Sequence, residues 1–147
     1  MTIQLPLTRL LACVFILAAI PAMAANRIVT IVAPAEVRSG DKLEVLISAS
    51  TDVPDGERIG FLHSEFSLDG GKTWNSFTFE EKLGRSASRT LGLTAGAAGT
   101  KVIVRARVAF RGGASGDVDF KGSPILWGTT WEKWLTPPAR NQIIYVR

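Results

Sequence analysis

A two-residue alternation between residues 101 and 111 constrains the fold of this chain more than any other feature. The apolar set is Val102, Val104, Ala106, Val108 and Phe110, and the intervening set is Ile103, Arg105, Arg107, Ala109 and Arg111. Successive side chains of an extended chain point to opposite faces, so this period predicts a strand with one face in a core. The other face is expected to lie largely against water, as in antiparallel sheets.

Shorter β-branched or alternating stretches predict further strands along the chain. They cover residues 27–32, 42–48, 59–67, 73–79, 86–94 and 140–147. About seven short strands separated by turn residues, without a convincing amphipathic helix, predict an all-β fold: one antiparallel immunoglobulin-like β-sandwich. A small barrel is the alternative. No internal repeat or linker divides the chain.

The first 24 residues have the pattern of a secretory signal. Arg9 precedes an apolar run and a Pro21 break, and Ala22-Met23-Ala24 fits a signal peptidase site. We therefore expect cleavage after residue 24, a mature domain over residues 25–147, and a periplasmic or secreted location. Cys13, the one cysteine, would leave with the signal, so no disulfide is expected.

The charge balance excludes some classes of partner. The formal net charge is +4, and loss of Arg9 leaves a mildly basic mature chain without a basic run. Such a chain is not expected to bind nucleic acid. No second apolar stretch approaches the ~20 residues needed to cross a bilayer, so no stable membrane insertion is expected after signal cleavage.

Residues 67–74 match the S-x-D-x-G-x-T-W pattern of an Asp-box. The specified positions are Ser67, Asp69, Gly71, Thr73 and Trp74. Asp and Gly favour a tight turn between two strands, Thr can fix the turn by hydrogen bonding, and Trp is expected to anchor the hairpin to a core. The motif therefore predicts structural rather than catalytic roles for these residues.

Together with Val102–Arg107, this motif resembles the Asp-box-containing immunoglobulin-like or fibronectin-like modules attached to secreted enzymes and molybdenum oxidoreductases. The resemblance covers only these two segments. It implies a module that mediates dimerisation or packing, and hence a partner more than a reaction. A sialidase is excluded because one such box in about 120 residues cannot build a propeller.

The segment between Arg111 and Arg140 has little strand pattern and contains Trp127, Trp131 and Trp134. Long irregular connections are often functional. The tryptophans either form an exposed aromatic strip for a protein or a sugar, or are buried over a sheet edge. Arg105, Arg107 and Arg111, with Lys101, are a second candidate surface, either a basic stripe for an acidic partner or an ordinary solvated face.

Metal sites are weakly represented, and no cofactor is expected. His63 and Glu65 share one strand face, Asp117 and Asp119 follow a glycine-rich stretch, and Asp52, Asp55 and Glu57 form an acidic loop, yet none completes a recognised ligand set. We expect a half-exposed strand histidine and turn-forming carboxylates instead.

These features predict an exported, non-catalytic binding or accessory module that packs on a protein partner through the tryptophan-bearing segment and the arginine face. A carbohydrate-binding module is one alternative. A small glycoside-acting enzyme using a carboxylate pair such as Glu65 and Asp117 is the other. Catalysis is disfavoured because the chain has one histidine and no G-x-S-x-G elbow, and its mature part has no cysteine.

Overall fold

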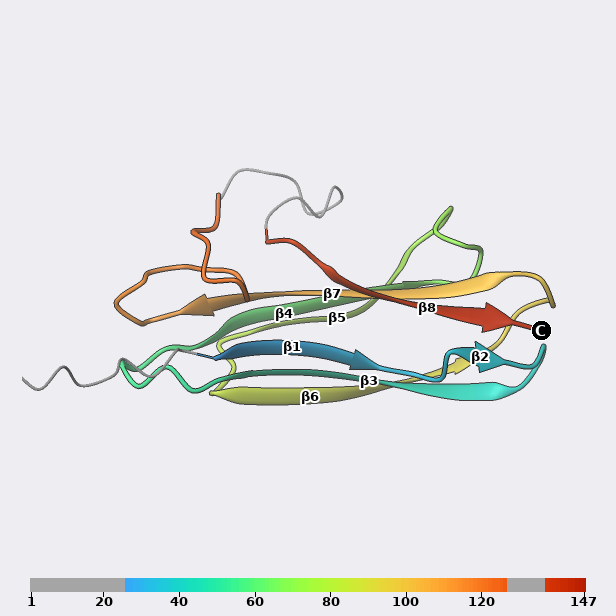
Figure 1. The fold of residues 1–147 in the computed structure, drawn as a ribbon, viewed down its shortest axis with the longest axis horizontal. Coiled ribbons are helices and arrows are strands. Elements are labelled where there is room, and N and C mark those ends of the chain that lie inside the picture. The colour runs from blue at the N-terminus through green and yellow to red at the C-terminus, as the bar shows by residue number, and fades with distance from the viewer. Residues whose placement is uncertain (1–25, 127–136) are drawn as a thin grey trace, which may run out of the picture.

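The computed structural model describes residues 26–126 and 137–147, which form two stacked β-sheets (Figure 1). One sheet has three strands, in the order β1 (Arg27–Val32), β3 (Lys42–Thr51) and β6 (Ser86–Thr94). The other has five, in the order β2 (Glu36–Val37), β8 (Arg140–Val146), β7 (Lys101–Arg111), β4 (Arg58–Ser67) and β5 (Asn75–Glu81).

The strand order is that of an immunoglobulin-like sandwich. The chain crosses between sheets at Pro34, because β1 pairs antiparallel with β3 whereas β2 pairs parallel with β8 in the other sheet. Proline cannot donate to a ladder, which suits a residue between two half-strands. The predicted all-β sandwich is confirmed, with the two-residue β2 as an eighth strand. The described part of the chain contains no helix that could span a membrane.

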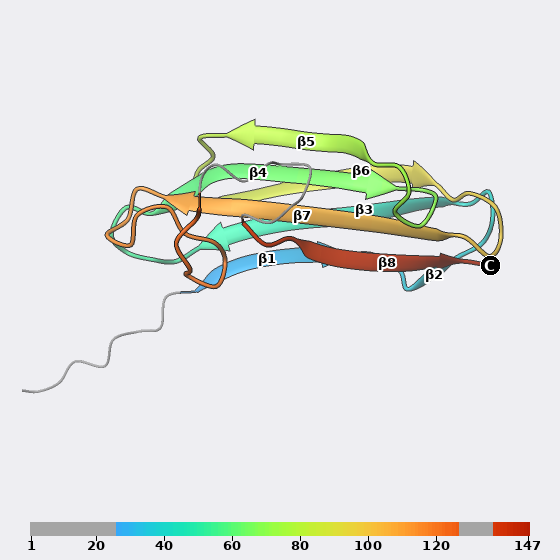
Figure 2. The same ribbon diagram turned by 90° about the horizontal axis from the view of Figure 1, so that it is seen from above.

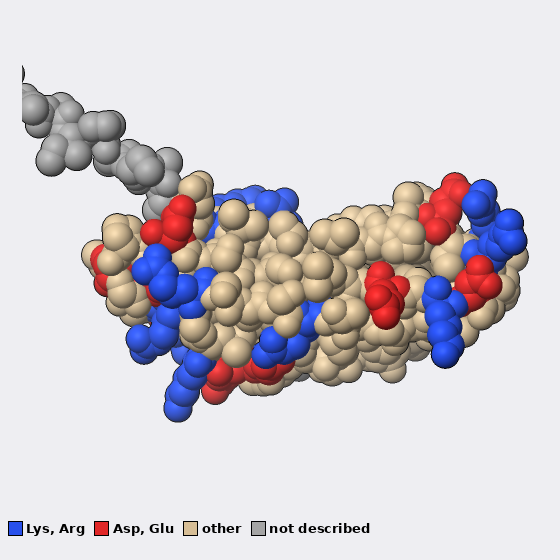
Figure 3. Space-filling view, turned by 90° about the horizontal axis from the view of Figure 1, so that it is seen from below, with Lys and Arg blue, Asp and Glu red and all other residues tan. Residues whose placement is uncertain are grey.

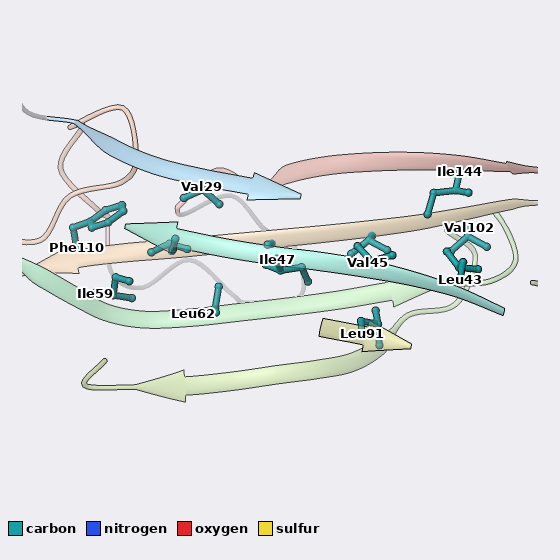
Figure 4. Packing of buried hydrophobic residues seen from close by; sticks show 14 of the residues in the cluster. Val29, Leu43, Val45, Ile47, Ile59, Leu62, Leu91, Val102, Phe110 and Ile144 are labelled. Carbon is teal, nitrogen blue, oxygen red and sulfur yellow. The ribbon is translucent and has the colours of Figure 1, made fainter. Parts of the chain in front are cut away.

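The core lies between the sheets, where the inward sets of β3 and β7 meet (Figure 4). All five apolar alternating residues of β7, from Val102 to Phe110, are fully buried. They pack with Leu43, Val45 and Ile47 of β3 in one cluster. The predicted inward face of this strand is therefore correct.

The expectation of a largely solvated outward face on β7 is wrong for part of its length. Arg107 and Ala109 are 0% exposed although they belong to the outward set. Ile125, in the loop after β7, packs with Phe61 and Ala109 in a second apolar cluster outside the main core. The loop is held to β7 by the Phe110–Val118 bridge. Tertiary contacts have therefore covered one end of this face.

A buried ion pair closes the end of the sandwich where β1 begins. Arg27 Nη2 lies 2.6 Å from Glu57 Oε2, and Thr51 Oγ1 donates to Glu57 Oε1 at 2.6 Å. Glu57 is 1% exposed. Because a buried carboxylate without a countercharge is costly, this pair ties the start of β1 to the β3–β4 loop.

Replacing Arg27 by Ala is expected to lower the free energy of unfolding by about 3–5 kcal/mol, because it leaves the carboxylate of Glu57 buried without its countercharge. The matched control is Arg147→Ala, which removes an exposed pair with Glu36 and should cost less than about 0.5 kcal/mol. Urea unfolding of both variants measures the difference. Equal losses of unfolding free energy in the two variants would contradict the claim that burial makes the Arg27–Glu57 pair important for stability.

Candidate functional site

A row of four polar side chains, His63 and Glu65 of β4 and Arg105 and Arg107 of β7, runs along the outer face of the five-stranded sheet. We call it the polar row. His63 lies opposite Arg107 and Glu65 opposite Arg105 in the β4–β7 ladder. Arg107 Nε and Nη2 lie 3.2 and 3.1 Å from His63 Nδ1. Arg105 Nη2 donates to Glu65 Oε2 at 2.6 Å.

His63 is held neutral in this row. A guanidinium only donates, so Nδ1 must accept from Arg107 and the ring proton resides on Nε2, which faces Glu65 Oε1 at 3.6 Å. Burial, the largest cause, acts together with Arg107 and Arg105 to lower the pKa of His63 from 6.5 to about 4, against the opposing effect of Glu65. The prediction of a half-exposed histidine is wrong, because only 8% of the residue is exposed.

The guanidinium of Arg105 in the polar row also stacks on an aromatic ring. This guanidinium lies 3.5 Å from the centroid of the Trp74 ring while it remains paired with Glu65. Such stacking stabilises both groups and holds the guanidinium flat. Trp74 was expected to anchor the hairpin in the core, but it lies half-buried on the outer face of the five-stranded sheet.

The turn between β4 and β5 places Trp74 there. Asp69 Oδ1 accepts from the backbone N–H groups of Lys72 and Thr73 at 2.9 Å, and Thr73 Oγ1 donates to Asp69 Oδ2 at 2.6 Å. Ser67 Oγ accepts from Gly71 N at 2.7 Å. The hydrogen bonds from Thr73 hold the pKa of Asp69 well below its usual range. Gly71 has a φ of 94°, a conformation that side chains disfavour.

Next to the polar row lies a largely apolar surface that shares Arg105 with the row. We call this surface the β7–β8 patch. It consists of Trp74, Ile103, Arg105, Ile143 and Tyr145. Ile103 pairs directly with Ile143, and a Cβ on Gly71 would lie 3.5 Å from Ile103 and 3.7 Å from Trp74, so the turn packs against the patch. Ile143 is 41% and Tyr145 51% exposed. Lys101 Nζ lies 5.5 Å from the Tyr145 ring at the rim.

The predicted site residues Arg111, Asp117 and Asp119 lie outside the polar row and the β7–β8 patch, and they bind other groups of the protein. Arg111 Nε donates to Asp117 Oδ2 at 3.1 Å, and Asp119 Oδ1 accepts from the backbone of Lys121 and Ser123. Trp127, Trp131 and Trp134 lie outside the described residues. The sequence prediction of contact residues at these tryptophans therefore stays a prediction.

The acidic groups considered as metal ligands bind protein groups instead. In the acidic loop, Asp52 pairs with Asn26, Asp55 with the backbone of Ala114, and Glu57 with Arg27. Over residues 26–126 and 137–147, no group of three His, Cys, Asp or Glu residues could hold a metal. Glu65 and Asp117, considered as a glycosidase pair, each form an ion pair with an arginine.

Sequence reasoning did not single out Ile143, Tyr145 or the 51% exposed Phe79. The sequence did contain a signal for Ile143 and Tyr145. The last strand has two apolar residues on alternate positions, 143 and 145, which share one strand face, and a contiguous exposed apolar patch is a feature of contact surfaces.

Comparisons with known proteins give distant structural matches only. No family model matches the chain, and no curated protein matches its sequence. The superoxide reductase (neelaredoxin) from Ignicoccus hospitalis is 13% identical, with 84% of each chain covered and a TM-score of 0.49. Murine CRIg is 14% identical, with 82% of this chain and 98% of that chain covered and a TM-score of 0.39. Neither match bears on what this chain binds.

The low pKa of His63 predicts an acid-sensitive fold. The unfolded state takes up a proton near pH 6.5 and the folded state only near pH 4, so stability is full above pH 6.5 and falls as the pH drops toward 4. Between pH 7 and 5 the loss should be about 1–2 kcal/mol.

The matched variant is His63→Asn, which keeps an acceptor for Arg107 and cannot titrate. Its stability should change less than that of the natural chain over the same pH interval, as measured by urea unfolding. Identical pH profiles for the two proteins would contradict a neutral, buried His63, because the chain has one histidine.

Proposed function

We propose that this chain is an exported, non-catalytic binding module that packs on a protein partner through the outer face of its five-stranded sheet. The single observation that carries the proposal is the β7–β8 patch. It joins two exposed apolar side chains, Ile143 and Tyr145, to an arginine stacked on a tryptophan. Tyrosine, tryptophan and arginine are the residues that dominate binding energy at protein interfaces.

Rigidity favours a contact role for this patch. Arg105 is fixed by Glu65 on one side and Trp74 on the other, and Trp74 follows a turn held by Asp69. Side chains that are ordered before binding lose little conformational entropy on binding. The patch also has a polar rim at Lys101 and Asn141, which lies opposite Arg105.

The arginines contribute differently from the basic stripe expected from the sequence. Arg105 and Arg111 are each paired with a carboxylate, and Arg107 is buried against His63. A charge-compensated face does not favour a strongly acidic ligand. It favours a partner with an apolar contact region and a few hydrogen-bonding groups. The signal pattern at residues 1–24 supports a partner in the periplasm or outside the cell.

The proposal predicts that Ile143→Lys weakens partner capture by about tenfold or more, because it places a charge in a desolvated contact. The matched control is Leu46→Lys. Leu46 is 40% and Ile143 41% exposed, and both lie on strands, but Leu46 belongs to the three-stranded sheet. Tagged mature chains are used to capture proteins from the envelope fraction of the producing cell, with thermal unfolding as a fold control.

Support requires a protein that is captured by the natural chain and by Leu46→Lys but is lost with Ile143→Lys. Tyr145 is the one tyrosine of the chain, so a fluorotyrosine label gives a single NMR signal that should shift on binding. Equal capture by both variants would overturn the proposed surface. Binding of purified glycans in place of any protein would favour the carbohydrate alternative.

A further inference from the structure

Within the described residues no strand pairs with the outer side of β6, and this edge is less protected than the other sheet edges. β5 ends in Glu80 and Glu81 and is bulged against β4, β1 is followed by Pro34, and β2 has two residues. Charges, bulges, proline and short length are the usual devices that prevent strand addition. By contrast, β6 has nine residues in unbroken register with β3. Its one protective charge is Arg89, which lies on the inward face and pairs with Glu80 of β5.

The hydrogen-bond register shows which backbone groups lie on that edge. Ala95 N donates to Asp41 O and Thr51 N donates to Arg85 O, at the two ends of the β3–β6 ladder. Hydrogen-bonded pairs alternate in an antiparallel ladder, so the odd-numbered residues of β6 bond to β3. The even-numbered residues therefore direct their N–H and C=O groups toward the free edge: Ser86, Ser88, Thr90, Gly92 and Thr94.

The free edge also borders a partly open stretch of core. Phe66, Phe77, Ala87 and Leu93 pack against the core cluster but are only partly buried. Figure 2 shows β5 outermost on this side of the molecule, with β6 lying inside it in the other layer. The five-stranded sheet therefore extends past the three-stranded sheet, and a single strand beside β6 would lie under β5.

We propose that β6 accepts an extended segment of a partner polypeptide as a fourth strand of the smaller sheet. Because β5 extends past β6, edge-to-edge approach of a second copy of the sandwich is hindered more than the addition of a single strand. Main-chain hydrogen bonds to the even-numbered residues supply the affinity, and alternate side chains supply the specificity. This site is separate from the β7–β8 patch and does not depend on it.

The residues next to the free edge of β6 indicate which side chains the bound segment should carry. Its inward side chains meet Ala87, Leu91 and Leu93, so most inward positions should be apolar. Arg89 also lies on this inward face and pairs with Glu80 of β5, so a small residue is expected next to it. The segment's outward side chains lie next to small neutral residues of β6, on a face whose charges gather mainly at its two ends (Figure 3). Small polar residues therefore fit there. One adjustment is required: Arg89 Nη1 caps the carbonyl of Ser88 at 2.7 Å and must release it.

The test uses a display library of linear nine-residue peptides, selected in parallel on the mature chain and on Thr90→Pro. Proline at position 90 removes a free-edge N–H and leaves the β3 ladder intact. Enriched peptides should alternate apolar and small polar residues and bind Thr90→Pro about tenfold more weakly, because one main-chain hydrogen bond is lost and the proline ring hinders close approach of the peptide backbone. Arg147→Ala, which changes an exposed residue after β8 in the other sheet, is the control and should bind them normally.

A second measurement does not depend on how well Thr90→Pro folds. Amide hydrogen exchange should slow at the even-numbered residues of β6 when a selected peptide binds, and peptides N-methylated at alternate positions should neither bind nor protect. Absence of enrichment, or unchanged binding to a folded Thr90→Pro, would overturn the proposal. Protection of the same amides at high protein concentration without peptide, together with a doubled mass, would assign the edge to a second copy instead.

Discussion

The hydrogen bond from Arg107 to His63 is the interaction on which the outer face of the five-stranded sheet depends. β7 places Arg107 outward, yet the residue is fully buried, and a buried guanidinium needs a partner. A neutral imidazole supplies an acceptor without adding a second buried charge. The bond also joins β4 to β7, leaves Glu65 to pair with Arg105, and so lets Arg105 lie against Trp74. One protonation state therefore supports the polar row and the neighbouring contact patch.

The sequence predicts the parts of the fold that depend on local periodicity. The alternation of β7 identified its buried face, and β-branched runs located most strands within a few residues. The outward residues were harder, because their environment is set by distant segments. Burial of Ala109 requires Ile125 from a later loop, and burial of His63 depends on its place opposite Arg107. The register shift between Ile59 and Phe61 turns Phe61 to the outer face, and no local pattern marks it.

The candidate site could be predicted only in part for the same reason. Arg105 and Trp74 were each singled out, but their stacking joins residues 31 positions apart and follows from the pairing of β4 with β7 and the turn at Asp69. Ile143 and Tyr145 were read as an ordinary closing strand. The two sheets therefore present different surfaces: aromatic and arginine groups on the larger sheet, and exposed aliphatic residues of β1 and β3 beside the small neutral residues of β6 on the smaller one.

The most direct test of this account is an NMR titration of the His63 imidazole, whose nitrogen shifts report the protonation state and tautomer together. The account predicts a single neutral ring with its proton on Nε2 and a pKa of about 4. A pKa at or above 6.5, or a proton on Nδ1 at neutral pH, would contradict it, because Nδ1 could then not accept from Arg107 and the polar row could not be ordered as described.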